Sequence, residues 1–271
     1  MKNLKKIIII IQARMTSTRL PGKVLKTVLG KSLLEYQLER IRRVSAVIPG
    51  LNGDPANSCH PELVSGSKPY IHDIIVATTD KITDDPIVTL CNKLGITVFR
   101  GSEDDVLSRY YYAAVQASAD TIVRITSDCP LIDPNIIDRV IDFYTAHSHE
   151  YSYVSNCLER TYPRGLDTEV FSFQALEQAF LRGNLPVHRE HVTPYITQNP
   201  ELFRQKNIAC EQNLGMHRWT VDTQEDFDLI KVIIEKLYPE NRNFTMHDVL
   251  LLFDIQPKLF FINAHVEQKH V

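Results

Sequence analysis

Apolar residues gather in short runs along the first half of the chain, and segments of helical length separate these runs. The first run is five isoleucines at 7–11, and β-branched or aliphatic runs follow at 73–79, 96–99 and 121–126. Runs of this length without polar alternation are typical of strands buried on both faces of a parallel sheet. Helical segments between them indicate a βαβ series. The sequence therefore predicts one α/β domain over 1–271, built on a doubly wound, mostly parallel sheet.

Polar residues at the borders of these segments predict where helices begin. Ser32 and Glu35 have the spacing of a capping box, in which each side chain bonds the backbone N–H of the other residue. Thr223 and Asp226 stand in the same relation near the end of the chain. Ser102 precedes three acidic residues and is predicted to cap the helix that follows the third apolar run.

The second half of the chain is less regular. Residues 151–156 alternate and read as a strand, 160–172 contain a turn followed by a strand, and 217–222 read as a further strand that ends in an acid. We expect the region around 150–215 to form a small antiparallel excursion of the sheet.

The stretch 47–70 breaks the succession of apolar runs and helical segments. It contains several prolines and glycines and shows no hydrophobic periodicity. Helix-to-strand connections in compact domains are commonly about 2–6 residues long. We interpret 47–70 as a flexible insertion, and an active-site lid is the alternative.

The loop after the isoleucine run concentrates positive charge. Residues 12–23 contain Arg14, Arg19 and Lys23 among small hydroxyl residues. Open α/β sheets bind ligands at the carboxyl ends of their strands, and fixed cations there suit a polyanion such as phosphate. The loop is not a Walker A sequence, because Val24 stands where that motif needs Ser or Thr. A solvated basic loop is the alternative interpretation.

Asp128 stands just past the fourth predicted strand, 121–126, and should point into the same crevice as the basic loop. Mg²⁺ in nucleotide enzymes commonly binds one or two carboxylates together with substrate phosphates. A turn in which Asp128 caps its own backbone before Pro130 is the alternative.

Three segments carry a resemblance to a known family. QARMTSTRLPGKVL at 12–25 resembles the signature of the sugar-acid cytidylyltransferases, which include the 3-deoxy-manno-octulosonate and acylneuraminate cytidylyltransferases. DCPLIDP at 128–134 and WTVDTQEDF at 219–227 are the other sharp matches. The chain is most similar to the spore coat polysaccharide biosynthesis protein F family, and the likeness extends over most of its length outside the insertion.

The resemblance implies a reaction and a set of residues. It implies that a sugar-acid hydroxyl attacks the α-phosphorus of CTP and that pyrophosphate leaves. Arg14, Arg19 and Lys23 would hold the phosphates, and Asp128 and Asp222 would hold Mg²⁺ as cofactor. Arg14, Lys23 and Asp128 are thus the expected catalytic residues. Without the resemblance, Asp222 would pass as a residue next to a helix cap.

Four further residues are candidates for the site. Arg100 ends the third strand at the same edge of the sheet, and the resemblance implies that it faces the nucleotide; a salt bridge to the acids that follow it is the alternative. Asp167 and Glu169 would share one face of a strand and meet the sugar acid or the metal, or simply form a polar face. His191 is either a general base or a structural histidine.

Composition and net charge limit the partners, metal sites and cellular location that we expect. The chain has 271 residues and a net charge of −3, which argues against a nucleic-acid or membrane-surface partner. Its five cysteines show no CxxC spacing, so we expect no zinc site and a reducing, cytoplasmic location. The oligomeric state stays open, with a homodimer as one option. A glycosyltransferase that uses a nucleotide-sugar donor and a catalytically silent nucleotide-binding subunit are the alternative functions.

Overall fold

The computed structural model describes residues 5–44 and 71–268. The predicted flexible insertion at 47–70 lies outside the described residues. In the described ranges, no helix is long and apolar enough to cross a membrane.

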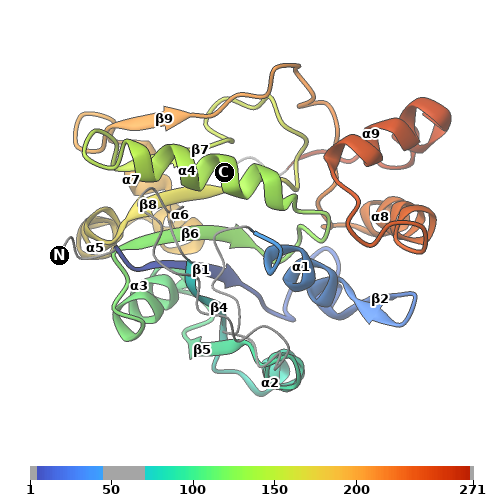
Figure 1. Cartoon of the computed structure of the whole chain (residues 1–271). Coiled ribbons are helices and arrows are strands. Elements are labelled where there is room, and N and C mark those ends of the chain that lie inside the picture. The colour runs from blue at the N-terminus through green and yellow to red at the C-terminus, as the bar shows by residue number, and fades with distance from the viewer. Residues whose placement is uncertain (1–4, 45–70, 269–271) are drawn as a thin grey trace, which may run out of the picture.

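A seven-stranded sheet in the order β5-β4-β1-β6-β8-β7-β9 forms the centre of the fold (Figure 1). β1, β4, β5 and β6 are parallel, β8 runs antiparallel to β6 and β7, and β9 is parallel to β7. The predicted α/β fold with a mostly parallel sheet and a small antiparallel part is therefore confirmed. The strands are β1 (Ile7–Gln12), β4 (Ile71–Thr79), β5 (Thr97–Gly101), β6 (Thr121–Thr126), β7 (Tyr153–Ser155), β8 (Glu169–Ser172) and β9 (Gln205–Asn207).

Helices cover both faces of the sheet, and a small hairpin stands beside its carboxyl edge (Figure 1). The hairpin pairs β2 (Thr27–Val28) with β3 (Lys31–Ser32). The α-helices are α1 (Leu33–Ile41), α2 (Asp85–Lys93), α3 (Val106–Gln116), α4 (Pro134–Ala146), α5 (Phe173–Arg182), α6 (Pro186–His191), α7 (Pro194–Thr197), α8 (Gln224–Leu237) and α9 (Met246–Ile255). The 3₁₀ helices are η1 (Lys23–Leu25), η2 (Ile82–Asp84) and η3 (Pro257–Ile262).

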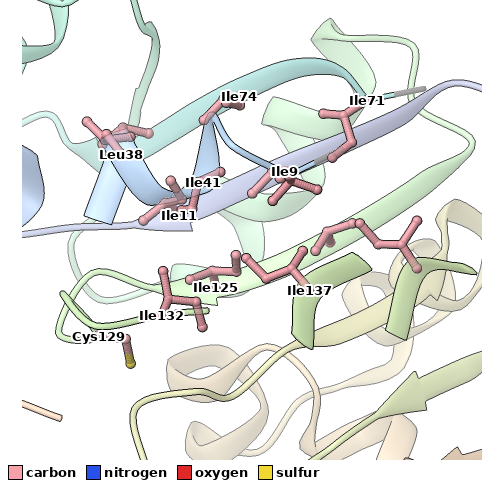
Figure 2. Packing of buried hydrophobic residues seen from close by; sticks show 14 of the residues in the cluster. Ile9, Ile11, Leu38, Ile41, Ile71, Ile74, Ile125, Cys129, Ile132 and Ile137 are labelled. Carbon is pink, nitrogen blue, oxygen red and sulfur yellow. The ribbon is translucent and has the colours of Figure 1, made fainter. Parts of the chain in front are cut away.

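The isoleucine run sorts its side chains between two hydrophobic cores, because successive residues of a strand point to opposite faces. Ile9 and Ile11 pack with side chains of α1, α4 and β6, as Figure 2 shows. Ile8 and Ile10 face the other core, which contains apolar residues of α3 and α5. Burying each isoleucine contributes about 1.5–3 kcal/mol. β1 is therefore the central support from which the basic loop emerges.

Two of the three predicted helix starts are confirmed. The capping boxes of α1 and α8 form at Ser32 and Thr223 as expected. The predicted cap at Ser102 is wrong, because Asp105 caps α3 by accepting a hydrogen bond from the backbone N–H of Ser108. The Asp105 carboxylate therefore takes the capping role expected of the Ser102 hydroxyl, and α3 begins three residues later than expected.

The predicted strand at 217–222 is also wrong. This segment is extended, but its backbone-to-backbone bonds to distant parts of the described chain are limited to an isolated bridge between Arg164 and Arg218 and a bond from Val221 N to Asp128 O. Trp219 and Val221 alternate with polar residues because they are buried in a third core, formed with α8 and α9. Arg218 and Thr220, which lie beside them, are also buried, but they bond Asp222 and the carbonyl of Asp128. A buried extended segment without strand pairing thus produced the alternating pattern.

Candidate active site

The basic loop is held in shape by hydrogen bonds at both ends. Gly22 donates its N–H to the carbonyl of Met15 and has a φ of 68°, a left-handed value that suits glycine. Met15 N in turn donates to Oδ1 of Asp84, at 2.8 Å. Asp84 is fully buried and also accepts bonds from the hydroxyl groups of Thr78 and Thr79. Asp84 therefore ties the loop to the carboxyl end of β4.

Lys23 brings together two acids that are far apart in the sequence. It lies at the start of η1, and its Nζ is 3.2 Å from Oδ2 of Asp128 and 2.8 Å from Oδ1 of Asp222. Asp128 follows β6, while Asp222 directly precedes α8 and its cap, Thr223. The parallel neighbours β1 and β6 thus present the cation and the first acid at one edge, and the extended segment adds the second acid.

Two arginines hold the other side of the Asp222 carboxylate. Oδ2 of Asp222 lies 2.9 Å from Nη2 of Arg19 and 2.9 Å from Nη2 of Arg218. Arg218 is buried and also contacts Asp226, which is fully buried at the start of α8. Sequence reasoning did not single out Arg218. Its position four residues before Asp222 was the one available sign that the two could form an ion pair.

These contacts set the charges at the centre of the site. Burial alone would lower the pKa of Lys23, but Asp128 and Asp222 outweigh burial and raise that pKa above its usual value. Burial alone would raise the pKa of Asp128, but Lys23 and the Thr126 hydroxyl lower it from 3.8 to about 2. Lys23 and Asp128 are therefore both charged at neutral pH.

A cleft of about 350 Å³ opens at this edge of the sheet. It combines many cations with a few acids, which is the charge pattern expected for a triphosphate and a metal ion. The lining cations are Arg14, Arg19, Lys23, Arg109, Arg124 and Arg164, and the lining acids are Asp128, Asp167, Glu190 and Asp222.

Sequence reasoning missed three of the lining arginines, and two of these lie inside predicted elements. Arg109, on α3, is 1% exposed and donates to the carbonyl groups of Ser102 and Glu103. Arg124, on β6, forms a buried ion pair with Glu169. Both look like core positions of a helix and a strand, so their charge was the only signal.

Of the further candidates at 167, 169 and 191, the structure brings two to the cleft and leaves one outside. Asp167 and His191 line it. Glu169 does not: it pairs with Arg124 and accepts bonds from Tyr153 and Thr193. Asp167 precedes β8 and forms two bonds with Arg160, so the expected shared strand face of Asp167 and Glu169 is wrong.

Arg100 lies outside the cleft. Its guanidinium donates to the carbonyl groups of Thr79 and Lys81 and forms an ion pair with Asp85 at 2.7 Å. The alternative of a salt bridge thus describes its position, although the partner precedes Arg100 in the sequence. We do not assign Arg100 to the nucleotide.

The donor set at Asp128 and Asp222 suits Mg²⁺ in a nucleotide complex. In the part of the chain that the structure describes, no three His, Cys, Asp or Glu residues form a metal cage. Mg²⁺ does not need one, since it commonly keeps several waters and binds one or two carboxylates plus phosphates. Asp128 and Asp222 both face the cleft and meet at one cation, Lys23.

Comparisons with known proteins show the family to which the chain belongs. A family model described as cytidylyltransferase matches residues 8–48 and 65–252. The chain is 33% identical over 233 residues to the spore coat polysaccharide biosynthesis protein SpsF of Bacillus subtilis, covering 85% of this chain and 87% of SpsF. It is 25% identical over 228 residues to the 3-deoxy-manno-octulosonate cytidylyltransferase of Pseudomonas fluorescens, covering 81% and 76%.

A solved structure extends the likeness to the whole fold. The structure of a cytidylyltransferase from Leptospira borgpetersenii superposes with a TM-score of 0.82 at 31% identity, covering 98% of this chain and 100% of that chain.

Proposed function

Because the chain belongs to the cytidylyltransferase family, we propose that it transfers a cytidylyl group from CTP to a hydroxyl of a sugar acid and releases pyrophosphate. The observation that carries this proposal is the contact of Lys23 with both Asp128 and Asp222 in one cationic cleft. The sugar-acid acceptor is supported by the name of the Pseudomonas relative, and a role in polysaccharide synthesis by the name of SpsF.

In this proposal, the basic loop holds the triphosphate. Arg14, Arg19 and Lys23 all line the cleft, and the first two are guanidinium groups that can bind phosphate oxygens in pairs. Asp84 fixes the backbone amide of Met15 in this loop, so the loop backbone needs little rearrangement to receive the nucleotide. Charge neutralisation and positioning by such groups supply most of the rate enhancement in phosphoryl-type transfer.

Asp128 and Asp222 supply the carboxylate oxygens for Mg²⁺. When bound, Mg²⁺ supplies Lewis-acid polarisation of the α-phosphate. The low pKa of Asp128 keeps that ligand ionised at any physiological pH. The contact of Arg218 with Oδ2 of Asp222 fixes the orientation of the second ligand.

The chemical step is a substitution at the α-phosphorus. The acceptor oxygen forms the new bond to phosphorus, and the bond from the α-phosphorus to the bridging oxygen breaks. The leaving pyrophosphate takes the electron pair, and the hydroxyl proton passes to solvent or to a base in the cleft. Lys23 and the loop arginines stabilise the negative charge that develops on pyrophosphate.

Pyrophosphate release tests the proposal directly. The protein is assayed with Mg²⁺, each of the four nucleoside triphosphates and a panel of sugar acids, and thermal shifts are recorded with each nucleotide. We expect stabilisation by CTP and turnover with CTP and a sugar acid. Stabilisation by a UDP- or GDP-sugar instead would indicate a glycosyltransferase, and CTP binding without turnover on any acceptor would indicate a silent subunit.

A matched pair of variants tests the metal ligand. Asp128→Asn keeps the shape of the side chain but removes its charge, so it should abolish turnover in a folded protein. Asp254→Asn, an exposed position on α9, should leave turnover unchanged. Full activity in Asp128→Asn would exclude Asp128 as a metal ligand.

A further inference from the structure

The segment after η3 reaches back to the residues that hold Asp222. The match to the cytidylyltransferase family model ends at residue 252, so this segment, 263–268, lies beyond the matched region. Asn263 is 3% exposed, and Gln268 lines the cleft together with Asp222. A segment outside the matched region thus forms part of the cleft wall.

Asn263 braces the backbone and the acid that surround Arg218. Its Nδ2 donates to the carbonyl oxygen of Arg218 at 2.9 Å and to Oδ1 of Asp226 at 2.8 Å. Asp226 is fully buried, and its Oδ2 also accepts the backbone N–H of Asp222 at 2.9 Å. Removing Asn263 would leave a buried carbonyl oxygen and a buried carboxylate oxygen each with one donor fewer.

Arg218 connects this bracing to the cleft. Its Nε and Nη2 donate to the two oxygens of Asp226, at 2.8 and 3.0 Å, and Nη2 also donates to Oδ2 of Asp222 at 2.9 Å. Its remaining nitrogen, Nη1, donates to Oε1 of Gln268. Every nitrogen of this buried guanidinium therefore has a fixed partner, and Gln268 supplies one of them.

We propose that Asn263 and Gln268 are positioning residues for the metal ligand Asp222 and that they act through Arg218. They fix the guanidinium so that it holds Oδ2 of Asp222 and leaves Oδ1 facing Lys23 and the cleft. The proposal rests on the proposed function, because it concerns the ligand role of Asp222. Residues that orient a metal ligand commonly change metal affinity or activity by about 10–100-fold when they are removed.

The test measures metal affinity, separately from turnover and stability. Mn²⁺ binding is followed by electron paramagnetic resonance in the presence of saturating CTP, for the full-length wild type and for Asn263→Ala and Gln268→Ala. We expect the Mn²⁺ Kd to rise by about tenfold or more in each variant. Gln268→Glu keeps an acceptor for Nη1 of Arg218, so it should restore an affinity close to that of the wild type.

Two control variants separate positioning from general destabilisation. Asn199→Ala removes an amide that donates to the carbonyl of Tyr195, after α7 and outside the cleft lining. Glu267→Ala changes the exposed neighbour of Gln268. Both should bind Mn²⁺ and CTP as the wild type does. Wild-type affinity in Asn263→Ala and Gln268→Ala, or an equal loss in the controls, would overturn the proposal.

A crystallographic comparison distinguishes failure of the inference from failure of the proposed function. If the wild type binds no Mn²⁺ with CTP, the proposed function fails. The positioning claim is then decided by crystal structures of the wild type and of Gln268→Ala. If the contact between Arg218 and Asp222 is lost only in the variant, the positioning claim is supported. If the contact is unchanged in the variant, the claim is refuted.

Discussion

Nζ of Lys23 lies 2.8 Å from Oδ1 of Asp222, although 199 positions separate the two residues in the sequence. The same ammonium lies 3.2 Å from Oδ2 of Asp128. One ammonium therefore contacts two partly buried acids, of which Asp222 also contacts Arg19 and Arg218. Removing Lys23 takes a cation away from both acids. The first two predictions follow from this relationship.

Lys23→Met keeps most of the side-chain volume and removes the charge. It leaves Asp128 and Asp222 close together without their shared cation, so the free energy of unfolding at pH 7 should fall by about 1–3 kcal/mol. Turnover should fall by about 10²–10³-fold, because a preorganised donor to the developing charge is lost. Urea unfolding and pyrophosphate release measure the two effects.

Lys26→Met is the matched control for Lys23→Met. The ammonium of Lys26 lies over the ring of Phe227 and bonds Gln224, outside the cleft lining. We expect near wild-type turnover from it. Equal losses in both lysine variants would show that Lys23 has no special place in the reaction.

Acid should weaken the folded state through Asp128. Its pKa is 3.8 as an ordinary aspartate and about 2 in the fold, so the folded state holds the ionised form more tightly than the unfolded chain does. This difference contributes about 2 kcal/mol. The contribution is fully present above about pH 4 and is lost as the pH falls to about 2.

The measurement compares wild type and Asp128→Asn by urea unfolding at several pH values. Asparagine does not titrate, so the stability difference between the two proteins should be about 2 kcal/mol larger near pH 6 than near pH 2. Parallel stability curves over this range would mean that Lys23 does not hold the Asp128 carboxylate as the structure shows.

Local sequence patterns predicted those parts of the fold in which the signal and its physical cause are neighbours. The isoleucine run at 7–11 indicated a strand buried on both faces, and Ser32 and Thr223 indicated helix starts, because each pattern reports a contact within a few residues. The convergence of Asp128 with Lys23 followed from one rule, that parallel strands end at the same edge.

The remaining site residues were beyond prediction because their partners are distant in the sequence. Asp84 stands just before α2 in the sequence, but it is fully buried and binds the backbone of Met15, 69 positions away. Asn263 follows η3, and no sequence pattern indicated a role for it at the site. The alternation at 217–222 was misread because a buried extended segment, with Trp219 and Val221 in a core and polar residues beside them, has the same pattern as a strand.

Gly165 permits the close approach of the turn before β8 to the segment that carries Asp222. Its φ is +100°, and a Cβ there would lie 2.6 Å from the carbonyl carbon of Trp219 and 2.8 Å from the backbone nitrogen of Thr220. Backbone atoms cannot rotate aside, so Gly165→Ala must displace one of the two segments. We expect the free energy of unfolding to fall by more than about 2 kcal/mol, and turnover to fall with it.

Gly30→Ala is the control for Gly165→Ala. Gly30 has a φ of +78° in the hairpin turn, but a Cβ there meets nothing within 4 Å. It should therefore cost only the backbone strain of about 1–2 kcal/mol and leave turnover intact. Equal stability and activity in the two variants would contradict the close packing of Gly165 on 219–220.

Arg14 and Arg100 should differ in their effect on CTP, although Arg14 follows β1 and Arg100 lies at the carboxyl end of β5, at the same edge of the sheet. Arg14 lines the cleft, whereas Arg100 is bound to Asp85 and to two carbonyl groups away from it. Arg14→Ala should raise the KM for CTP by about tenfold or more, because a charged hydrogen bond is worth about 1.5–3 kcal/mol. Arg100→Ala should leave that KM within about twofold and cost at most about 1 kcal/mol of stability, since its ion pair is half-exposed. Steady-state kinetics at saturating acceptor measure the KM for CTP of both variants. A large rise in KM for Arg100→Ala would mean that CTP binding draws Arg100 from Asp85 into the cleft, as the resemblance to the sugar-acid enzymes implied.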